Sequence, residues 1–136
     1  MNALKQYQQV NSQTSVVDAD PHRLIQLLFA GALERMHMAK ARMQAKDYEG
    51  KNRLINKSIE IVAGLRSFLD FEKGGDLAAQ LEALYDYIER ILFQANVQND
   101  PEKIDEAASL LRNVKEGWDG IREEATPQQT ERSNAV

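Results

Sequence analysis

Glu34 and His37 form a Glu-x-x-His pattern, a spacing that binds metal ions in some helical proteins. Helical bundles bind two iron ions with this motif from each of two helices and a further Glu from each of the other two. The chain has a single copy. At 100° per residue, Glu34 and His37 also lie away from the apolar seam of their helix, on the solvent side. The pattern therefore predicts no metal centre.

The remaining polar candidates favour structural roles. His22 follows Pro21 in a first helical turn and has no partner nearby in sequence, so we expect a surface histidine. Glu123-Glu124 and the pair Asp70 and Glu72 lie near helix ends, where caps or solvated faces explain them. The chain has no cysteine, no phosphate-binding loop and no Gly-x-Ser-x-Gly motif. We predict neither an active site nor a cofactor.

Composition narrows the function classes further. The 136 residues include 21 acidic and 17 basic side chains, a balance that argues against a nucleic-acid partner. The longest apolar run, residues 27–33, is too short to cross a bilayer, so we expect no direct membrane insertion. The first residues lack the apolar region of a signal peptide. These features predict a cytoplasmic protein.

Glycine and proline mark where the helices begin and end. The fold class predicted from them is all-α, an antiparallel up-down-up-down four-helix bundle with a short N-terminal capping helix or segment. Asp20-Pro21 and Asp100-Pro101 each supply an N-cap and a first helical proline. Gly74-Gly75 is expected to stop the second helix, with Asp76 capping the third. The predicted domain spans residues 1–125, with a cap or lid at 1–17, helices at about 21–46, 47–71, 77–96 and 101–125, and a disordered tail at 126–136.

The helices differ in how much of their circumference is apolar. The first has a seam of Ile25, Leu28, Ala32, Met36, Ala39 and Met43. The fourth carries a stripe about as wide as a core-facing helix needs. The second and third carry wider arcs. The third has a seam of Leu77, Leu81, Leu84, Ile88, Ile91 and Ala95, flanked by Tyr85, Tyr87 and Leu92. Two interpretations stay open: neighbouring segments cover these arcs, or they form an exposed groove for a partner.

If the groove is open, the candidate partner contacts are the apolar residues at the margins of the two wide arcs. These are Ile61, Leu65, Phe68, Tyr85, Tyr87 and Leu92. Leu4, Tyr7 and Val10 are spaced on one side of a short N-terminal helix. They are the candidates for a movable lid, or for a fixed cap, over part of the same surface.

Several blocks of the sequence resemble the flagellar secretion chaperone family, the FliS proteins. They are the N-terminal Tyr7, the helix start at residues 21–29, Leu69-Asp70 with Gly74-Gly75, the Leu84-Tyr85-Asp86-Tyr87 block, and Ala95-Asn96 with Asp100 ahead of a tryptophan-bearing helix. The resemblance covers about residues 4–121. The part from the double glycine to Tyr87 is the most specific.

This resemblance implies a cytosolic, non-enzymatic export chaperone. Its client would be the C-terminal segment of flagellin, held so that it does not polymerise prematurely and delivered to the flagellar type III export gate. A chaperone groove predicts a monomer or weak dimer when the client is absent. The alternatives are a helical-bundle adaptor or homodimerisation module without a flagellin client, and a bundle enzyme or metal carrier.

Overall fold

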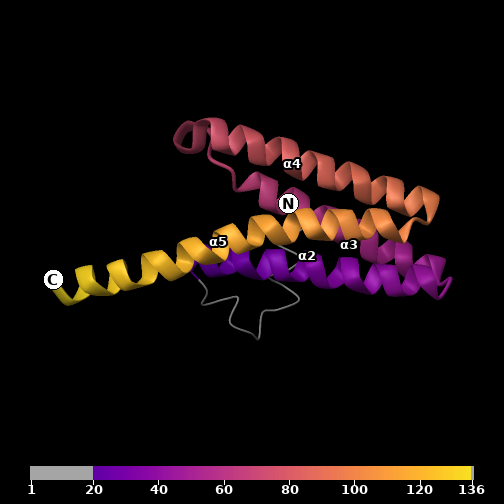
Figure 1. Cartoon of the computed structure of the whole chain (residues 1–136), viewed down its shortest axis with the longest axis horizontal. Coiled ribbons are helices and arrows are strands. Elements are labelled where there is room, and N and C mark those ends of the chain that lie inside the picture. Colours follow the sequence, from indigo (N-terminus) through magenta and orange to yellow (C-terminus); the bar gives the residue numbers. More distant parts are fainter. Residues whose placement is uncertain (1–19, 136) are drawn as a thin grey trace.

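A computed structural model describes the backbone of residues 20–135 and the side chains of residues 20–121. Its helices are α2 (Pro21–Gln44), α3 (Tyr48–Ser67), α4 (Phe71–Gln98) and α5 (Pro101–Ala135). Each helix packs on the next, and α5 closes the ring by packing on α2 (Figure 1). The predicted antiparallel four-helix bundle is confirmed. The predicted cap at residues 1–17, with Leu4, Tyr7 and Val10, lies outside the described residues.

Two aspartates cap the first pair of helices. Asp20 accepts a hydrogen bond from the Arg23 backbone N–H at 2.7 Å, and Pro21 occupies the first turn of α2, as predicted. Asp47 caps α3 by accepting from the Gly50 backbone N–H at 3.0 Å. Lys46, between these helices, has a φ of 62°, the left-handed conformation that reverses the chain tightly. Local side-chain chemistry therefore sets both helix starts.

The predicted role of the double glycine is wrong in detail. α3 ends at Ser67, and Asp70 caps α4 by accepting from the backbone N–H groups of Glu72 and Lys73. Gly75 has φ 51° and ψ −125°, which are not helical, so the predicted break is present but lies within the span of α4, where it separates a short first turn from the long helix. The physical reason is that Asp70 offers a cap before the glycines are reached, and a short turn forms ahead of the kink.

The end of α5 also differs from the prediction. The helix continues to Ala135, beyond the expected end near residue 125 and through residues 126–135 of the segment that was predicted to be disordered. Figure 1 shows this extension projecting past the other helices. The prediction rested on the lack of apolar side chains to bury. A helix continues through backbone hydrogen bonds between residues four positions apart, and these bonds do not require an apolar side chain to be buried.

The core runs along the inside of the ring. Buried side chains include Leu28, Ala32, Met36, Ala39 and Met43 of the predicted α2 seam, and Ile88, Ile91 and Ala95 of the α4 seam. Leu77 was expected in the same seam but lies exposed, because α4 presents Ala78 to the bundle after the kink. The seams were thus predicted well except where the glycine changes the direction of α4.

A buried lysine joins α3 to the end of α4. Lys51 is only 4% exposed, and its ammonium donates to the Asn96 carbonyl oxygen at 3.0 Å and to the Asn99 side-chain oxygen at 2.7 Å. Asn99 has a φ of 52° and terminates α4. Lys51 therefore satisfies acceptors at a helix C-terminus, where a positive charge is also favourable.

Replacing Lys51 with methionine keeps the aliphatic stem but removes both donated bonds. We expect the free energy of unfolding to fall by about 1.5–3 kcal/mol, the usual range for hydrogen bonds from a charged group. Urea unfolding measures it. Arg53→Met, at an exposed position of the same helix, is the control and should change stability by less than about 0.5 kcal/mol. Equal losses in the two variants would contradict the capping role.

Candidate partner-binding surface

An apolar groove opens at the end of the bundle where α4 begins. It has a volume of about 100 Å³ and is lined by side chains from all four helices and from the α3–α4 connection. The lining residues are Ile25, Phe29, Leu65, Phe68, Leu69, Leu81, Tyr85, Val114 and Trp118. We call this set the apolar groove. It is a recess that an apolar side chain of a partner fits, with no charged group in its lining.

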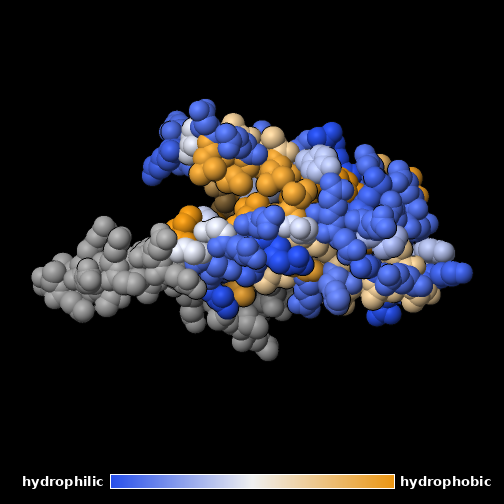
Figure 2. Space-filling model, viewed as in Figure 1, coloured by the Kyte–Doolittle hydropathy of each residue, from blue (hydrophilic) through white to orange (hydrophobic). Residues whose placement is uncertain are grey.

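Several apolar side chains at this end of the bundle are exposed to solvent. Phe68 is 40% exposed, and Phe71 and Leu77 at the start of α4 are more exposed still. Figure 2 shows hydrophobic side chains facing one another across a hollow between α4 and the rest of the bundle. A contiguous apolar surface of this kind is typical of a protein-binding site.

Trp118 fixes the α5 wall of the apolar groove to the start of α2. Its indole N–H donates to the His22 carbonyl oxygen at 3.1 Å, and the two rings stack with centroids 4.3 Å apart. His22 was predicted to be a surface residue. It is half-buried, because the packing of α5 on α2 brings a residue 96 positions away against it.

A small polar network supports the same wall. Asp119 accepts from the Gln26 amide at 2.7 Å and from the Lys115 ammonium at 2.6 Å. Burial alone would raise the pKa of Asp119, but these two hydrogen bonds, with the positive charge of Lys115 and the nearby His22, lower it. The carboxylate therefore stays charged and holds α5 against α2 beside the apolar groove.

Tyr85 lines the apolar groove with a neutral side chain. Its side chain is buried, and burial raises the pKa of its hydroxyl to about 12. Tyr85 is therefore uncharged at any physiological pH, and the apolar groove presents no ionised group to a partner.

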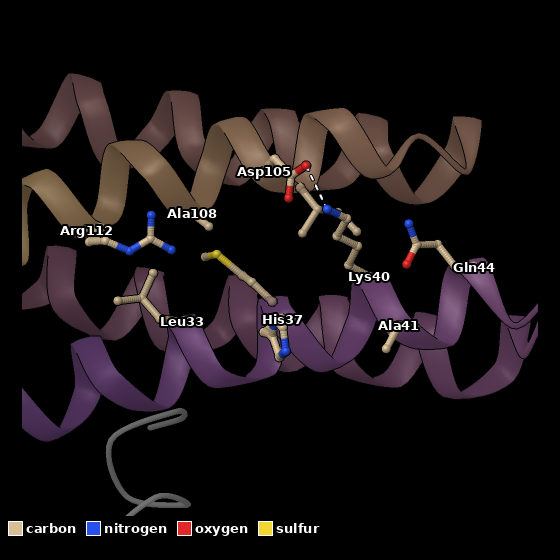
Figure 3. A pocket seen from close by; sticks show the side chains of 10 residues that line it. Leu33, His37, Lys40, Ala41, Gln44, Asp105, Ala108 and Arg112 are labelled. Atoms are coloured by element: carbon tan, nitrogen blue, oxygen red, sulfur yellow. Dashed lines mark hydrogen bonds and ion pairs between the residues drawn. The ribbon is translucent and has the colours of Figure 1, made fainter.

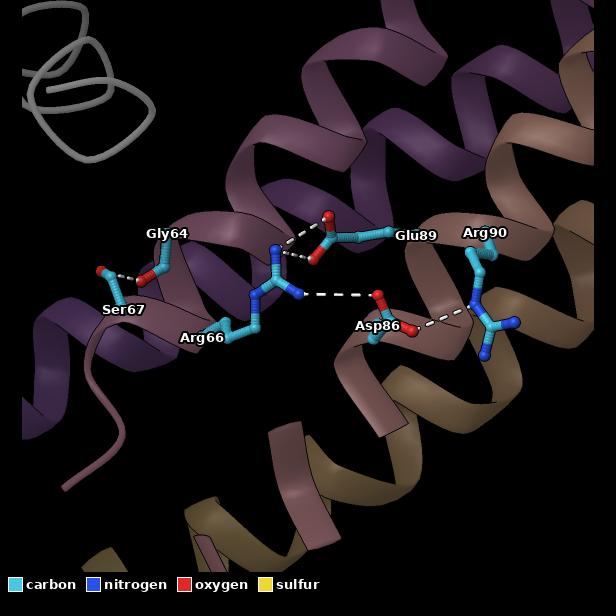
Figure 4. Close-up of polar contacts among 6 residues, drawn as sticks. All are labelled: Gly64, Arg66, Ser67, Asp86, Glu89 and Arg90. Carbon is cyan, nitrogen blue, oxygen red and sulfur yellow. Dashed lines mark hydrogen bonds and ion pairs between the residues drawn. The ribbon is translucent and has the colours of Figure 1, made fainter. Parts of the chain in front are cut away.

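A second recess lies between α3 and α4. It has a volume of about 470 Å³ and is lined by Ile59, Asp86, Glu89, Arg90, Phe93 and Gln94. Arg66 on α3 bridges two carboxylates of α4, with nitrogen–oxygen distances of 3.2 Å to Glu89 and 3.7 Å to Asp86 (Figure 4). Arg90 pairs with Asp86 at 3.0 Å. This recess combines apolar and charged side chains, unlike the apolar groove.

Glu89 makes one pH-dependent contribution at this rim. Burial raises its pKa above 4.5, and Asp86 adds to the rise while Arg66 opposes it. The folded protein therefore retains this proton to higher pH than the unfolded chain. The stability linked to Glu89 is fully present below about pH 4.5 and is lost as the pH rises through the folded-state pKa.

Glu89→Gln should therefore gain stability relative to the wild type as the pH rises from about 4 to about 7. Urea unfolding at both pH values measures the difference. Glu82→Gln, at an exposed position of the same helix, is the control. For each variant, the free energy of unfolding relative to the wild type is compared between the two pH values. If this difference changes no more for Glu89→Gln than for Glu82→Gln, the prediction is contradicted.

The structure brings together three of the predicted contact residues and separates the others. Leu65, Phe68 and Tyr85 line the apolar groove. Ile61 and Leu92 are buried in the core, so their predicted place at the margin of an exposed arc is wrong. Helical angles could not show that α3 and α4 turn these sides toward the other helices.

Tyr87 lies on another face of α4. Its side chain is 40% exposed, and its hydroxyl donates to the Glu106 carboxylate of α5 at 2.7 Å. This hydrogen bond is the main reason that the pKa of Tyr87 is raised. Tyr87 is therefore exposed, as a margin residue should be, but it is not part of the apolar groove.

Sequence reasoning missed Trp118 and Val114 as lining residues, and Phe93 beside α3. The first two were assigned to a core stripe, which is correct for their inner edge only. Phe93 and Val97 are both exposed and stand four positions apart. That spacing is a short second stripe beside the α4 seam, and it was the available signal.

Glu34 and His37 were predicted to lie on the solvent side of their helix and to form no metal centre. Both are exposed, on the solvent side of α2 as predicted. Within the described part of the chain, no three His, Asp or Glu side chains gather closely enough to hold a metal ion.

Comparison with known proteins shows which family the chain belongs to. Residues 3–125 match the family described as flagellar protein FliS. The chain belongs to the FliS family. It is 50% identical over 121 residues to flagellar secretion chaperone FliSB of Pseudomonas aeruginosa, covering 89% of this chain and 96% of that protein. It is 39% identical over 130 residues to the FliS chaperone of Salmonella typhimurium, covering 95% of this chain and 96% of that one.

The predicted family is therefore confirmed, and with it a chaperone in place of an enzyme. A third FliS chaperone, from Vibrio cholerae, is 38% identical over 119 residues, and the match covers 88% of this chain and 88% of that protein. Among the described residues, none of the helices combines the length and apolar character needed to cross a bilayer. The FliS match leaves open which surface binds a client.

Proposed function

We propose that this protein binds the C-terminal segment of flagellin in the cytoplasm, keeps it from polymerising prematurely and delivers it to the flagellar export gate. Membership of the FliS family supports an export chaperone. The apolar groove is the observation that supports a binding surface for an unfolded segment. Its lining is neutral and apolar, which suits a client that buries apolar side chains as it becomes ordered.

Within this proposal, Leu65, Phe68 and Tyr85 contact the client. The deepest of these side chains, Leu65 and Tyr85, form the floor, and the half-exposed Phe68 forms the rim. Ile61 and Leu92 act through the core and have no exposed surface to offer. A client segment longer than the apolar groove continues into the α3–α4 recess, where Ile59 and Phe93 supply apolar contacts.

The decisive experiment is co-purification with flagellin. We expect the full chain to retain intact flagellin and to lose it when the C-terminal segment of flagellin is deleted. Retention of both forms would overturn the proposed client segment. Sedimentation of the chain alone distinguishes the chaperone from the homodimerisation module, because a chaperone with a free groove is expected to be a monomer or weak dimer. A tight dimer that excludes flagellin would support the adaptor instead.

The N-terminal residues Leu4, Tyr7 and Val10 are proposed to cover the apolar groove when the client is absent. The support is position: α2 begins at Pro21, and Ile25 in its first turns lines the apolar groove. The N-terminal segment therefore joins α2 close to the surface that it is proposed to cover.

Deleting residues 1–17 should strengthen binding of a flagellin C-terminal peptide, because the client no longer displaces a competing segment. We expect the dissociation constant to fall by about threefold or more, corresponding to roughly 0.7 kcal/mol. Fluorescence anisotropy measures it, and circular dichroism checks folding. Loss of helix content on deletion would instead identify the segment as a fixed cap.

A further inference from the structure

A polar pocket on the opposite side of the bundle from the α3–α4 recess is not used by the proposed client site. It lies between α2 and α5, has a volume of about 210 Å³, and is shown in Figure 3. Its lining residues are Leu33, Met36, His37, Lys40, Ala41, Gln44, Ile104, Asp105, Ala108 and Arg112. One water occupies about 30 Å³ of liquid, so the pocket has room for a side chain.

The base of this pocket is apolar and its rim is cationic. Met36 and Ile104 are buried beneath it. In Figure 3, Arg112 reaches into the pocket from α5 at one end, and Lys40 crosses from α2 to Asp105 at the other. The Lys40–Asp105 distance is 2.9 Å. With one carboxylate against two cations, the rim is positive although the whole chain carries a charge of −4.

The hydrogen-bonding capacity of the rim is incompletely used. Asp105 occupies one of the three donors of Lys40. Among residues 20–121, no partner lies within hydrogen-bonding or ion-pair distance of the Arg112 guanidinium. An arginine fork presents its donors in the geometry of a carboxylate, and a lysine beyond it adds a second positive charge. The apolar base suits the methylenes that carry such a group.

We propose that this pocket binds the carboxylate of a glutamate side chain in an acidic, partly apolar segment of a second protein partner. Arg112 binds the carboxylate bidentately, Lys40 contributes a second donor, and the partly exposed Leu33 contacts the aliphatic stem. Because α2–α5 and α3–α4 are opposite sides of the ring, this partner binds while the α3–α4 recess is occupied. The charge complementarity of the pocket, not its volume, selects the occupant.

The test uses the full chain, labelled for NMR, and a blocked Ala-Glu-Leu-Ala peptide at millimolar concentration. We expect saturable shifts confined to α2 and α5 near the pocket, and none with the Ala-Gln-Leu-Ala counterpart. Arg112→Gln should weaken binding at least about fivefold. Arg53→Gln removes the same charge from an exposed position of α3 and should leave binding unchanged.

Three results would overturn the proposal. Equal shifts with the glutamine peptide, or equal weakening by the two arginine variants, would show non-specific contact. Inorganic phosphate is the third arm, and equal saturation with phosphate would identify a general anion site in place of a site for an acidic segment. None of these outcomes depends on flagellin binding, so they are separate from the test of the client site.

Discussion

Replacing Phe68 with serine is expected to weaken binding of a flagellin C-terminal peptide by about tenfold or more. Phe68 is the most exposed aromatic side chain in the lining of the apolar groove, at 40%. Aromatic anchors at the centre of an interface contribute disproportionately to affinity, and tenfold corresponds to about 1.4 kcal/mol. Isothermal titration of the full chain with the peptide measures the change.

The matched control for this variant is Tyr48→Ser. Tyr48 is the first residue of α3, whereas Phe68 directly follows the last one, and Tyr48 is 47% exposed, so the change removes a similar amount of apolar surface. It should leave peptide affinity within about twofold, because Tyr48 lines neither the apolar groove nor the α3–α4 recess. Comparable losses in both variants would place the client elsewhere. Preserved helix content in both would show that neither effect arises from unfolding.

The second large effect concerns stability. Leu92→Ala should lower the free energy of unfolding by about 2–5 kcal/mol, since Leu92 is 0% exposed and truncation leaves a cavity in the core. Urea or thermal unfolding measures the loss. This outcome also tests the earlier expectation that Leu92 is a partner contact, because a side chain used mainly for binding would lose affinity with little loss of stability.

Leu77→Ala provides the control within the same helix. The chemical change is identical, but Leu77 is 63% exposed, so its truncation should change stability by no more than about 0.5 kcal/mol. A similar destabilisation in both variants would contradict the burial pattern of α4. A loss of client affinity in Leu77→Ala alone would extend the client surface along the start of α4.

Much of the fold could be predicted from features of short stretches of the sequence. The cap formed by Asp20, the first-turn proline at Pro21 and the α2 seam were predicted correctly because they involve residues within one or two helical turns. The double glycine shows the limit of such reading. Gly75 does adopt a positive φ, as a glycine breaker should, but Asp70 had already begun the helix.

The binding surface was predicted only in outline, because helical angles give the width of an apolar arc but not what covers it. Leu65, Phe68 and Tyr85 belong to the apolar groove, whereas Ile61 and Leu92 from the same arcs lie in the core. The difference is set by α2 and α5, which are distant in sequence. His22 is the clearest case, since its neighbour Trp118 lies on the last helix.

The sequence by itself determined the helix-forming segments, the bundle class and the family, because periodicity, caps and sequence blocks that resemble a family are properties of short stretches of residues. Only the tertiary structure decided which apolar side chains are open to a partner. Exposure depends on how four helices cross and where α4 bends, and these follow from packing across the whole ring. The same packing decided that Lys40 and Arg112, 72 positions apart, meet at one pocket.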